Sequence, residues 1–187
     1  MNMEKSGSEF QNEGDLTRQR IAYFDRNKDR PLEVLESLAR FMSRQEMAKL
    51  LCYADAMRAT EGVAGSILEC GVYRGNGLMA WAKLSAALEP YNYPCKVIGF
   101  DTFEGNTPLT AMDKLTSSAI HAHEGGYKAD SEEDLRECIS IFDADRPLNH
   151  INKVALIRGD IGHTAEGYIR DNPHLLVRIL SLVDEPS

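Results

Sequence analysis

The sequence predicts an α/β fold built on a parallel β-sheet, with helices at the N-terminus. Short apolar segments of strand length alternate with longer amphipathic segments of helical period, which is the pattern of βαβ units. The first of these apolar segments runs directly into a glycine-rich loop that opens a helix. Both observations are typical of open sheets with right-handed crossovers, which bind ligands at the carboxyl ends of their strands.

The first third of the chain carries no strand-like segment and is predicted to be helical. Residues 1–14 are polar and are predicted to form a disordered tail. Residues 15–65 are predicted to form an N-terminal helical segment, in which Pro31 suits a first helical position. Ser43 and Glu46 form the S-x-x-E pattern of a capping box, which predicts that another helix begins there.

Residues 66–187 are predicted to form the α/β domain itself. Each predicted strand is a short run rich in Val, Ile and Leu, as expected for strands that are buried on both faces. The predicted strands cover residues 67–71, 96–101, 154–157 and 176–183, and the predicted helices cover residues 76–88, a segment that begins at Ser131, and residues 164–170.

Composition narrows the class of function. The chain has 187 residues, the size of one domain, and a formal net charge of −8, which argues against a dedicated binder of nucleic acid or of anionic membranes. Its 4 cysteines are widely spaced without a CxxC pair, so reduced thiols are expected rather than a zinc site or disulfides. The polar N-terminus does not resemble a signal peptide, and the chain is expected to be cytoplasmic.

Polar residues follow three of the predicted strands at the point where each strand ends. The loop after the first strand begins at Gly71, the second strand ends at Asp101, and the third is followed by Gly159 and Asp160. Because parallel strands bring their carboxyl ends to one edge, these loops are predicted to converge on a single crevice. Gly71 and Gly75 would let the backbone turn sharply there and lie against a ligand.

The residue types at this crevice fit a nucleoside. An acid at the end of the second strand, here Asp101, is expected to accept hydrogen bonds from ribose hydroxyls. Asp160 is predicted to contact an adenine amino group, and Phe103 to lie against the adenine face.

Glu69 helps to distinguish between the candidate cofactors. Dinucleotides place a pyrophosphate on the first glycine loop, which favours G-x-G-x-x-G and no neighbouring carboxylate. Here the glycines are spaced G-x-x-x-G-x-G, and Glu69 stands two residues before the first of them. A carboxylate repels pyrophosphate but suits a cationic ligand, so the loop favours S-adenosylmethionine, which carries an ammonium and a sulfonium.

Three segments resemble the macrocin O-methyltransferase family (the TylF/MycF type). They are Glu-Cys-Gly-Val-Tyr-Arg-Gly at 69–75, Gly-Phe-Asp-Thr-Phe-Glu-Gly at 99–105 and Arg-Gly-Asp-Ile at 158–161. The resemblance implies a class I, Rossmann-like methyltransferase fold that uses S-adenosylmethionine. It also implies magnesium-assisted methyl transfer to a hydroxyl of a sugar or glycosylated natural product.

The resemblance also implies roles for individual residues. The methionine end of the cofactor would lie against the first loop, the ribose against the second and the adenine against the third. The cofactor-binding residues implied in this way are Glu69, Gly71, Val72, Tyr73, Gly75, Asp101, Thr102, Phe103, Gly159, Asp160 and Ile161. Residues 106–131 would form part of a lid or acceptor wall. The N-terminal helices would cap the site or pair subunits, so a homo-oligomer such as a homodimer is expected.

Two departures from the family pattern bear on activity. The family often has Gly-Ser where this chain has Asn76 and Gly77, which removes one side-chain contact to the cofactor carboxylate. The family's aspartate-rich segment after the fourth strand is matched only by a short run, in which Asp184 is the one candidate catalytic residue and magnesium ligand. We therefore expect a methyltransferase sheet truncated after its fourth parallel strand, with that last strand at an exposed edge.

Two alternative functions remain open from the sequence. One is a truncated or degenerate methyltransferase that binds the cofactor without turnover. The other is an oxidoreductase that binds NAD or another nucleotide, against which the glycine spacing and Glu69 both count.

Overall fold

A computed structural model describes residues 5–103 and 131–182 of the chain, with the side chains of the first helix described from residue 14 onward. The chain divides into two compact units between Leu50 and Leu51, and each unit is treated by itself. The first unit is helical, and the second contains the whole β-sheet.

The first unit contains helix α1 (Lys5–Asp25), helix α2 (Pro31–Glu36), the short 3-10 helix η1 (Leu38–Arg40) and the start of helix α3 (Arg44–Ala59). Pro31 is the first residue of α2, as predicted. The capping box forms as predicted, because the Ser43 amide donates to the Glu46 carboxylate at 2.7 Å and the Glu46 amide donates to the Ser43 hydroxyl at 3.0 Å. Where the sequence predicts a tail up to residue 14, helix α1 already begins at Lys5.

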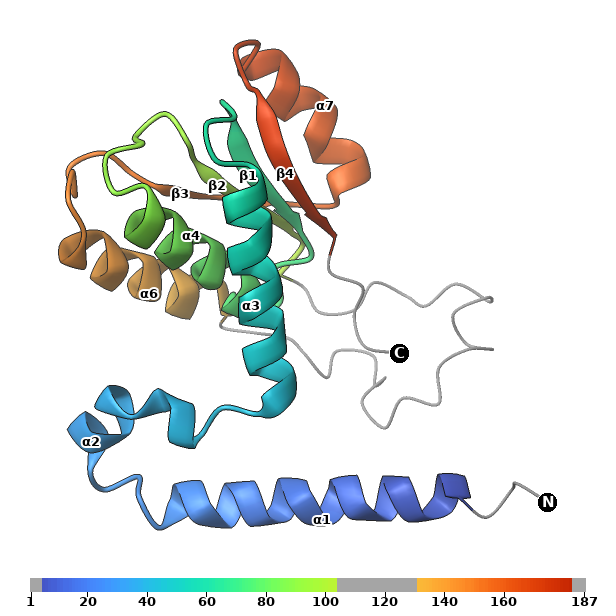
Figure 1. Ribbon diagram of the computed structural model, residues 1–187. Coiled ribbons are helices and arrows are strands. Elements are labelled where there is room, and N and C mark those ends of the chain that lie inside the picture. The colour runs from blue at the N-terminus through green and yellow to red at the C-terminus, as the bar shows by residue number, and fades with distance from the viewer. Residues whose placement is uncertain (1–4, 104–130, 183–187) are drawn as a thin grey trace. The chain divides into compact units, whose positions relative to one another are not determined.

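The second unit is an α/β domain around a four-stranded, wholly parallel sheet (Figure 1). The strands are β1 (Ser66–Cys70), β2 (Val97–Asp101), β3 (Val154–Arg158) and β4 (Val177–Leu182), and they lie side by side in the order β3-β2-β1-β4. Strands β2 and β3 are thus added in turn on one side of β1, and β4 pairs with β1 on its other side. This topology confirms the predicted Rossmann-like α/β class.

Helices cover both faces of this sheet. Helix α4 (Asn76–Leu88) follows β1, helix α6 (Ser131–Asp145) precedes β3, and helix α7 (Ile161–Asp171) connects β3 to β4. Successive residues of a strand point to opposite faces, and in β2 Gly99 lies against Leu78 of α4 whereas the Phe100 ring contacts the Tyr168 ring of α7. Helices α4 and α7 therefore pack on opposite faces, as Figure 1 also shows.

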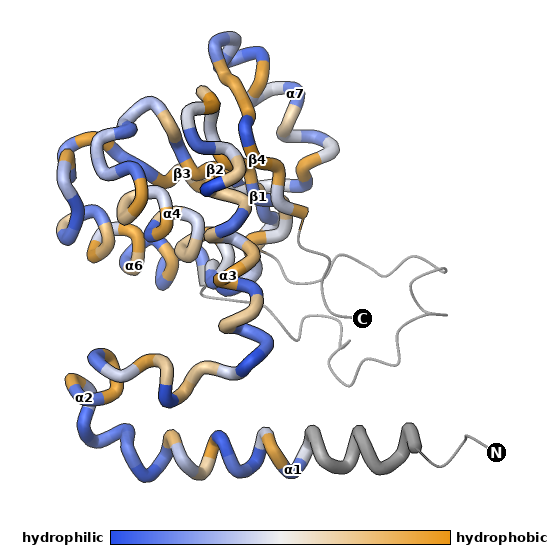
Figure 2. Tube along the Cα trace, in the orientation of Figure 1, coloured by the Kyte–Doolittle hydropathy of each residue, from blue (hydrophilic) through white to orange (hydrophobic). Residues whose placement is uncertain are grey.

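The core lies between the sheet and the α4 face. Ile67 of β1, Val97 of β2 and Leu78 of α4 are inaccessible to solvent, and Trp81 joins the same cluster. Burial of each such side chain contributes roughly 1.5–3 kcal/mol. In Figure 2 the strands are mostly orange and the coloured part of α1, from residue 14 onward, is mostly blue, so the hydrophobic residues gather in the sheet. All 4 cysteines are free thiols, and none of the described helices is both long and apolar enough to cross a bilayer.

Strand β4 forms one edge of the sheet, because among the described residues its only ladder partner is β1. Leu180 and Leu182 remain exposed on this strand, at 58% and 70%. Within the described residues, β4 is therefore the edge strand that the sequence predicts. A buried ion pair connects β4 to the end of α4. The guanidinium nitrogens of Arg178 donate to the two carboxylate oxygens of Glu89 at 2.6 Å and 2.8 Å.

Candidate functional site

The site lies at the carboxyl ends of β1, β2 and β3, where the order of the strands brings three loops to one edge of the sheet. Two backbone hydrogen bonds join the strand ends. The Gly71 amide donates to the Phe100 carbonyl at 3.0 Å, and the Gly159 amide donates to the Asp101 carbonyl at 2.9 Å. The three polar segments singled out in the sequence are therefore neighbours in space, as predicted.

The loop after β1 turns through three left-handed residues. Gly71, Tyr73 and Gly75 have φ values of 82°, 52° and 81°, and the Gly75 amide closes the turn by donating to the Val72 carbonyl at 2.8 Å. Glycine adopts such angles without steric cost, whereas a tyrosine does so under strain. Val72 is buried beneath the turn, and Tyr73 and Arg74 are exposed above it.

Helix α4 begins at this loop without a side-chain cap. Gly75 occupies the N-cap position, and no side chain accepts a hydrogen bond there. A side chain at Gly75 would overlap the Leu135 side chain of α6, and a Cβ at Gly77 would lie 2.7 Å from a carboxylate oxygen of Glu69. The glycines of this motif therefore make room for Leu135 and Glu69, and the serine of the family pattern would crowd Glu69 here.

Glu69 lies under the first turn of α4 and is 1% exposed. Neither carboxylate oxygen has a hydrogen-bond partner among the described residues, and neither does the indole nitrogen of Trp81. Burial raises the pKa of Glu69 to about 7, because removal from water penalises the charged form. The Leu78 amide and the Trp81 indole lie near enough to oppose this rise, although neither reaches good hydrogen-bonding geometry.

Asp101 links the first two loops. One of its carboxylate oxygens accepts from the Tyr73 amide at 2.7 Å, and the other accepts from the Phe103 amide at 2.8 Å. Each carboxylate oxygen has a further lone pair, so Asp101 can still accept a hydroxyl. Thr102 lies between the two bonded residues and is half-buried. Phe103 has a φ of 53° and is only 6% exposed, because its ring joins the hydrophobic core.

The third loop is shaped by a helix cap. Gly159 has a φ of 128°, and Asp160 is the N-cap of α7, where its carboxylate accepts from the Gly162 amide at 2.7 Å. This cap explains why α7 begins at Ile161, earlier than the helix predicted for residues 164–170. Asp160 and Ile161 are both exposed, so both are open to a ligand at this edge.

Several of the predicted elements lie outside the described residues. Asp184 is one of them, and so is the predicted lid except for Ser131, the first residue of α6. Within the described ranges, no group of three His, Cys, Asp or Glu side chains could hold a metal ion.

The structure draws attention to two residues that sequence reasoning did not assign to the site. Arg74 lies in the glycine loop, with its guanidinium carbon 5.4 Å from the centroid of the Tyr73 ring. Trp81 fits its predicted role in helix packing, but its indole nitrogen also faces Glu69. The signal for Arg74 was its place inside the glycine motif, and the signal for Trp81 was its place on the α4 face that covers β1.

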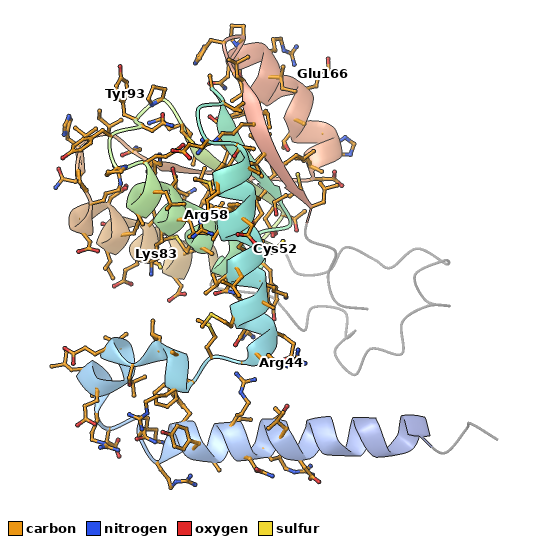
Figure 3. The ribbon with its side chains drawn as sticks, viewed as in Figure 1. Arg44, Cys52, Arg58, Lys83, Tyr93 and Glu166 are labelled. Atoms are coloured by element: carbon orange, nitrogen blue, oxygen red, sulfur yellow. The ribbon has the colours of Figure 1, made fainter. Side chains whose placement is uncertain are left out.

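A groove of about 880 Å³ lies between α4 and α6, away from the strand ends. Lys83 of α4, labelled in Figure 3, lines it together with Cys138 and Ile141 of α6. No residue of the three strand-end loops contributes to its lining, so we do not assign it to the site.

Comparison with known proteins gives matches among solved structures. No family model matches the chain, and no curated protein matches it significantly. The crystal structure of CalS11, calicheamicin methyltransferase, matches with a TM-score of 0.79 and 26% identity over 91% of this chain and 67% of that one. The apo structure of CalS11, TDP-rhamnose 3′-O-methyltransferase, matches with a TM-score of 0.74 and 23% identity over 92% of this chain and 66% of that one.

The chain thus spans about two thirds of the length of these solved structures. Its four parallel strands, the flanking helices and the strand-end loops form the Rossmann-like fold of methyltransferases. The structure is that of a methyltransferase of the S-adenosylmethionine-dependent class. It is similar to CalS11, and membership of the TylF/MycF family stays a prediction from the sequence.

Proposed function

We propose that this chain is an S-adenosylmethionine-dependent O-methyltransferase that acts on a hydroxyl of a sugar or glycosylated natural product. The observation that carries the proposal is the pairing of Asp101 with the glycine loop, beside a buried Glu69 under the uncapped start of α4. The sugar acceptor is supported by the sequence resemblance and by the similarity to CalS11, a TDP-rhamnose 3′-O-methyltransferase.

The residues of the site fit this cofactor. S-adenosylmethionine ends in an amino acid, whose ammonium suits the Glu69 carboxyl and whose carboxylate suits the start of α4, where no side chain caps the helix. The second oxygen lone pairs of Asp101 suit ribose hydroxyls, and Asp160 and Ile161 would flank the adenine. A dinucleotide would instead place its pyrophosphate beside Glu69, and the negative charges of the pyrophosphate and of the carboxylate would repel each other.

The other loop residues are assigned to the methionine, ribose and adenine parts of the cofactor in the same way. Gly71, Val72, Tyr73 and Gly75 would form the wall against the methionine end, with Thr102 beside the ribose and Gly159 beside the adenine. Phe103 would support this wall from the core instead of stacking on the adenine face, because its ring is buried.

Catalysis in this proposal depends mainly on positioning. When bound, S-adenosylmethionine supplies an electrophilic methyl group on a good leaving group. The chain's task is to hold that group in line with an acceptor oxygen and to exclude water, and correct orientation alone supplies several kcal/mol of a barrier, about 7–11 in favourable systems. The linked loops of β1 and β2 provide a rigid base for this alignment, because Asp101 bonds to both.

Magnesium assistance, with Asp184 as its ligand and catalytic residue, remains a proposal from the resemblance alone. The described residues do not include a group of three His, Cys, Asp or Glu side chains that could hold a metal ion. Homo-oligomer formation and cytoplasmic location are likewise proposals from the sequence.

Ligand-induced thermal stabilisation tests the proposed cofactor. A ligand that binds only the folded state raises the unfolding temperature in proportion to the logarithm of its excess over Kd. Millimolar S-adenosylhomocysteine should raise the Tm of the chain, and NAD at the same concentration should not. Stabilisation by NAD alone would favour the oxidoreductase alternative and overturn the proposal.

A further inference from the structure

A buried polar cluster lies directly beneath the glycine loop. It consists of the Glu69 carboxyl, the Trp81 indole N–H and the Tyr53 phenol, contributed by β1, α4 and α3 respectively. The rings of Tyr53 and Trp81 lie 4.4 Å apart between centroids, so the cluster is closely packed. The Glu69 oxygens and the Trp81 nitrogen are each buried without a hydrogen-bond partner in the described part of the chain.

The surroundings of Glu69 carry no compensating positive charge among the described residues. On its own strand the neighbouring titratable group is the Cys70 thiol, and from α3 it is the Tyr53 phenol, each with its pKa raised by burial and by Glu69. Its partners across the sheet are Gly99 in β2 and Ser181 in β4, both uncharged. A carboxylate buried without a cation is costly, so these surroundings favour the protonated acid.

The position of Glu69 makes this acid sensitive to a bound cation. Its oxygens lie against the first turn of α4, on the same turn where the methionine end of the cofactor is proposed to bind. A unit positive charge a few ångströms away acts strongly in a poorly hydrated interior, and it stabilises the carboxylate over the acid. The partial positive charge at the start of α4 acts in the same direction.

We propose that Glu69 is a proton-linked counter-charge for the cationic methionine end of the cofactor. Before the ligand binds, Glu69 holds a proton, and binding of the ammonium-bearing ligand ionises it. The O–H bond of the acid breaks, its electron pair stays on the carboxylate, and the proton passes to the solvent buffer. This inference rests on the proposed function, because it takes the cofactor and its orientation from there.

Calorimetric titration in two buffers measures the released proton. Phosphate and Tris differ widely in their enthalpy of protonation, so a proton released on binding makes the observed enthalpy depend on the buffer. At pH 7 binding of S-adenosylhomocysteine to the full chain should release about half a proton. The matched ligand is 5′-methylthioadenosine, which keeps the adenosine and thioether but has no ammonium, and its binding enthalpy should not depend on the buffer.

Two substitutions complete the test. Glu69→Gln keeps the size of the side chain but cannot ionise, so the buffer dependence for S-adenosylhomocysteine should vanish. Glu61→Gln, at an exposed position, should leave it intact. In the unmodified chain the apparent Kd for S-adenosylhomocysteine should be about tenfold weaker at pH 6 than at pH 8, since protons compete with the ligand below the pKa of Glu69.

The outcomes separate this inference from the proposed function. Binding of S-adenosylhomocysteine without buffer dependence, or dependence that persists in Glu69→Gln, would overturn the inference and leave the cofactor assignment intact. Failure of the folded, unmodified chain to bind S-adenosylhomocysteine would contradict the proposed function itself. If Glu69→Gln does not fold, the two ligands and the two pH values on the unmodified chain still decide the result.

Discussion

The carboxylate of Asp101 accepts a hydrogen bond from the backbone amide of Tyr73 at 2.7 Å, across 28 positions of the sequence. The acid at the end of β2 thereby fixes the loop that follows β1, while its other oxygen fixes the Phe103 amide of its own loop. Both Tyr73 and Phe103 have positive φ angles. Asp101 therefore holds two strained turns in place, and its role in shaping the site precedes any contact with a ligand.

Replacement of Asp101 by alanine should disturb both loops. The substitution removes two charge-assisted hydrogen bonds. Such a bond contributes about 1.5–3 kcal/mol to stability, and the bond to the exposed Tyr73 amide is expected to contribute less. We expect a loss of about 2 kcal/mol in the free energy of unfolding and at least tenfold weaker binding of S-adenosylhomocysteine. Urea denaturation and calorimetry measure the two effects. Asp55→Ala on the exposed face of α3 is the control, and equal effects at both positions would refute the role of Asp101.

The buried Glu69 should make the stability of the chain fall as the pH rises. Folding raises its pKa from 4.5 to about 7, so the folded state binds more protons than the unfolded state between these values. The contribution of Glu69 to stability is then fully present below pH 4.5 and is lost as the pH rises through 7. At pH 8 ionisation of the buried carboxyl lowers the free energy of unfolding by about 3 kcal/mol relative to low pH.

Urea denaturation of the unmodified chain and of Glu69→Gln from pH 5 to pH 8 measures this penalty. As the pH rises, the free energy of unfolding of the unmodified chain should fall relative to that of Glu69→Gln. A difference that stays constant over the range would show that Glu69 ionises freely in the folded state.

The ion pair between Arg178 and Glu89 should be important for keeping β4 in the sheet. The Arg178 side chain is 0% exposed and also contacts the Cys95 sulfur at 3.4 Å, and the ion pair lowers the pKa of Glu89. Removal of one partner from a buried pair costs about 3–5 kcal/mol, because the other charge is left uncompensated. Arg178→Met should therefore destabilise the chain by about 3 kcal/mol in chemical denaturation.

The exposed pair between Arg58 and Asp55 is a matched control for that experiment. Its side chains are 62% and 77% exposed, so Arg58→Met should cost less than about 1 kcal/mol. If the two methionine variants lose the same stability, burial of the Arg178 pair is not what fastens β4.

Gly75 and Gly62 offer a second matched pair of substitutions. Both have left-handed backbones, with φ values of 81° and 76°, but a Cβ at Gly75 would overlap Leu135 whereas a Cβ at Gly62 would meet open space. Gly62→Ala should cost about 1 kcal/mol from backbone strain alone. Gly75→Ala should cost about 1–3 kcal/mol more, because Leu135 must move. Equal losses in thermal denaturation would show that Leu135 does not pack against the loop.

The parts of the fold that sequence could predict are those set by local pattern. The bounds predicted for α4, residues 76–88, agree with the structure because a glycine turn and Pro90 delimit it. The strands and their parallel direction follow from apolar runs that alternate with helices, whereas the strand order β3-β2-β1-β4 was not predicted. The capping box at Ser43 is likewise a local signal.

The rest depends on contacts between distant segments, which no local pattern reveals. Phe103 was predicted to face a ligand, but its ring is in the core. Gly77 was read as the loss of a cofactor contact, whereas the structure shows that Glu69 occupies the space beside it. Asp160 was predicted to contact adenine, and its carboxylate also caps α7.

A crystal structure of the chain grown with S-adenosylhomocysteine tests the central claim most directly. We expect the ribose hydroxyls within hydrogen-bonding distance of the Asp101 carboxylate and the ligand's ammonium on the α4 turn above Glu69. Ligand density in the groove between α4 and α6, or a ligand whose ribose lies away from Asp101, would contradict it.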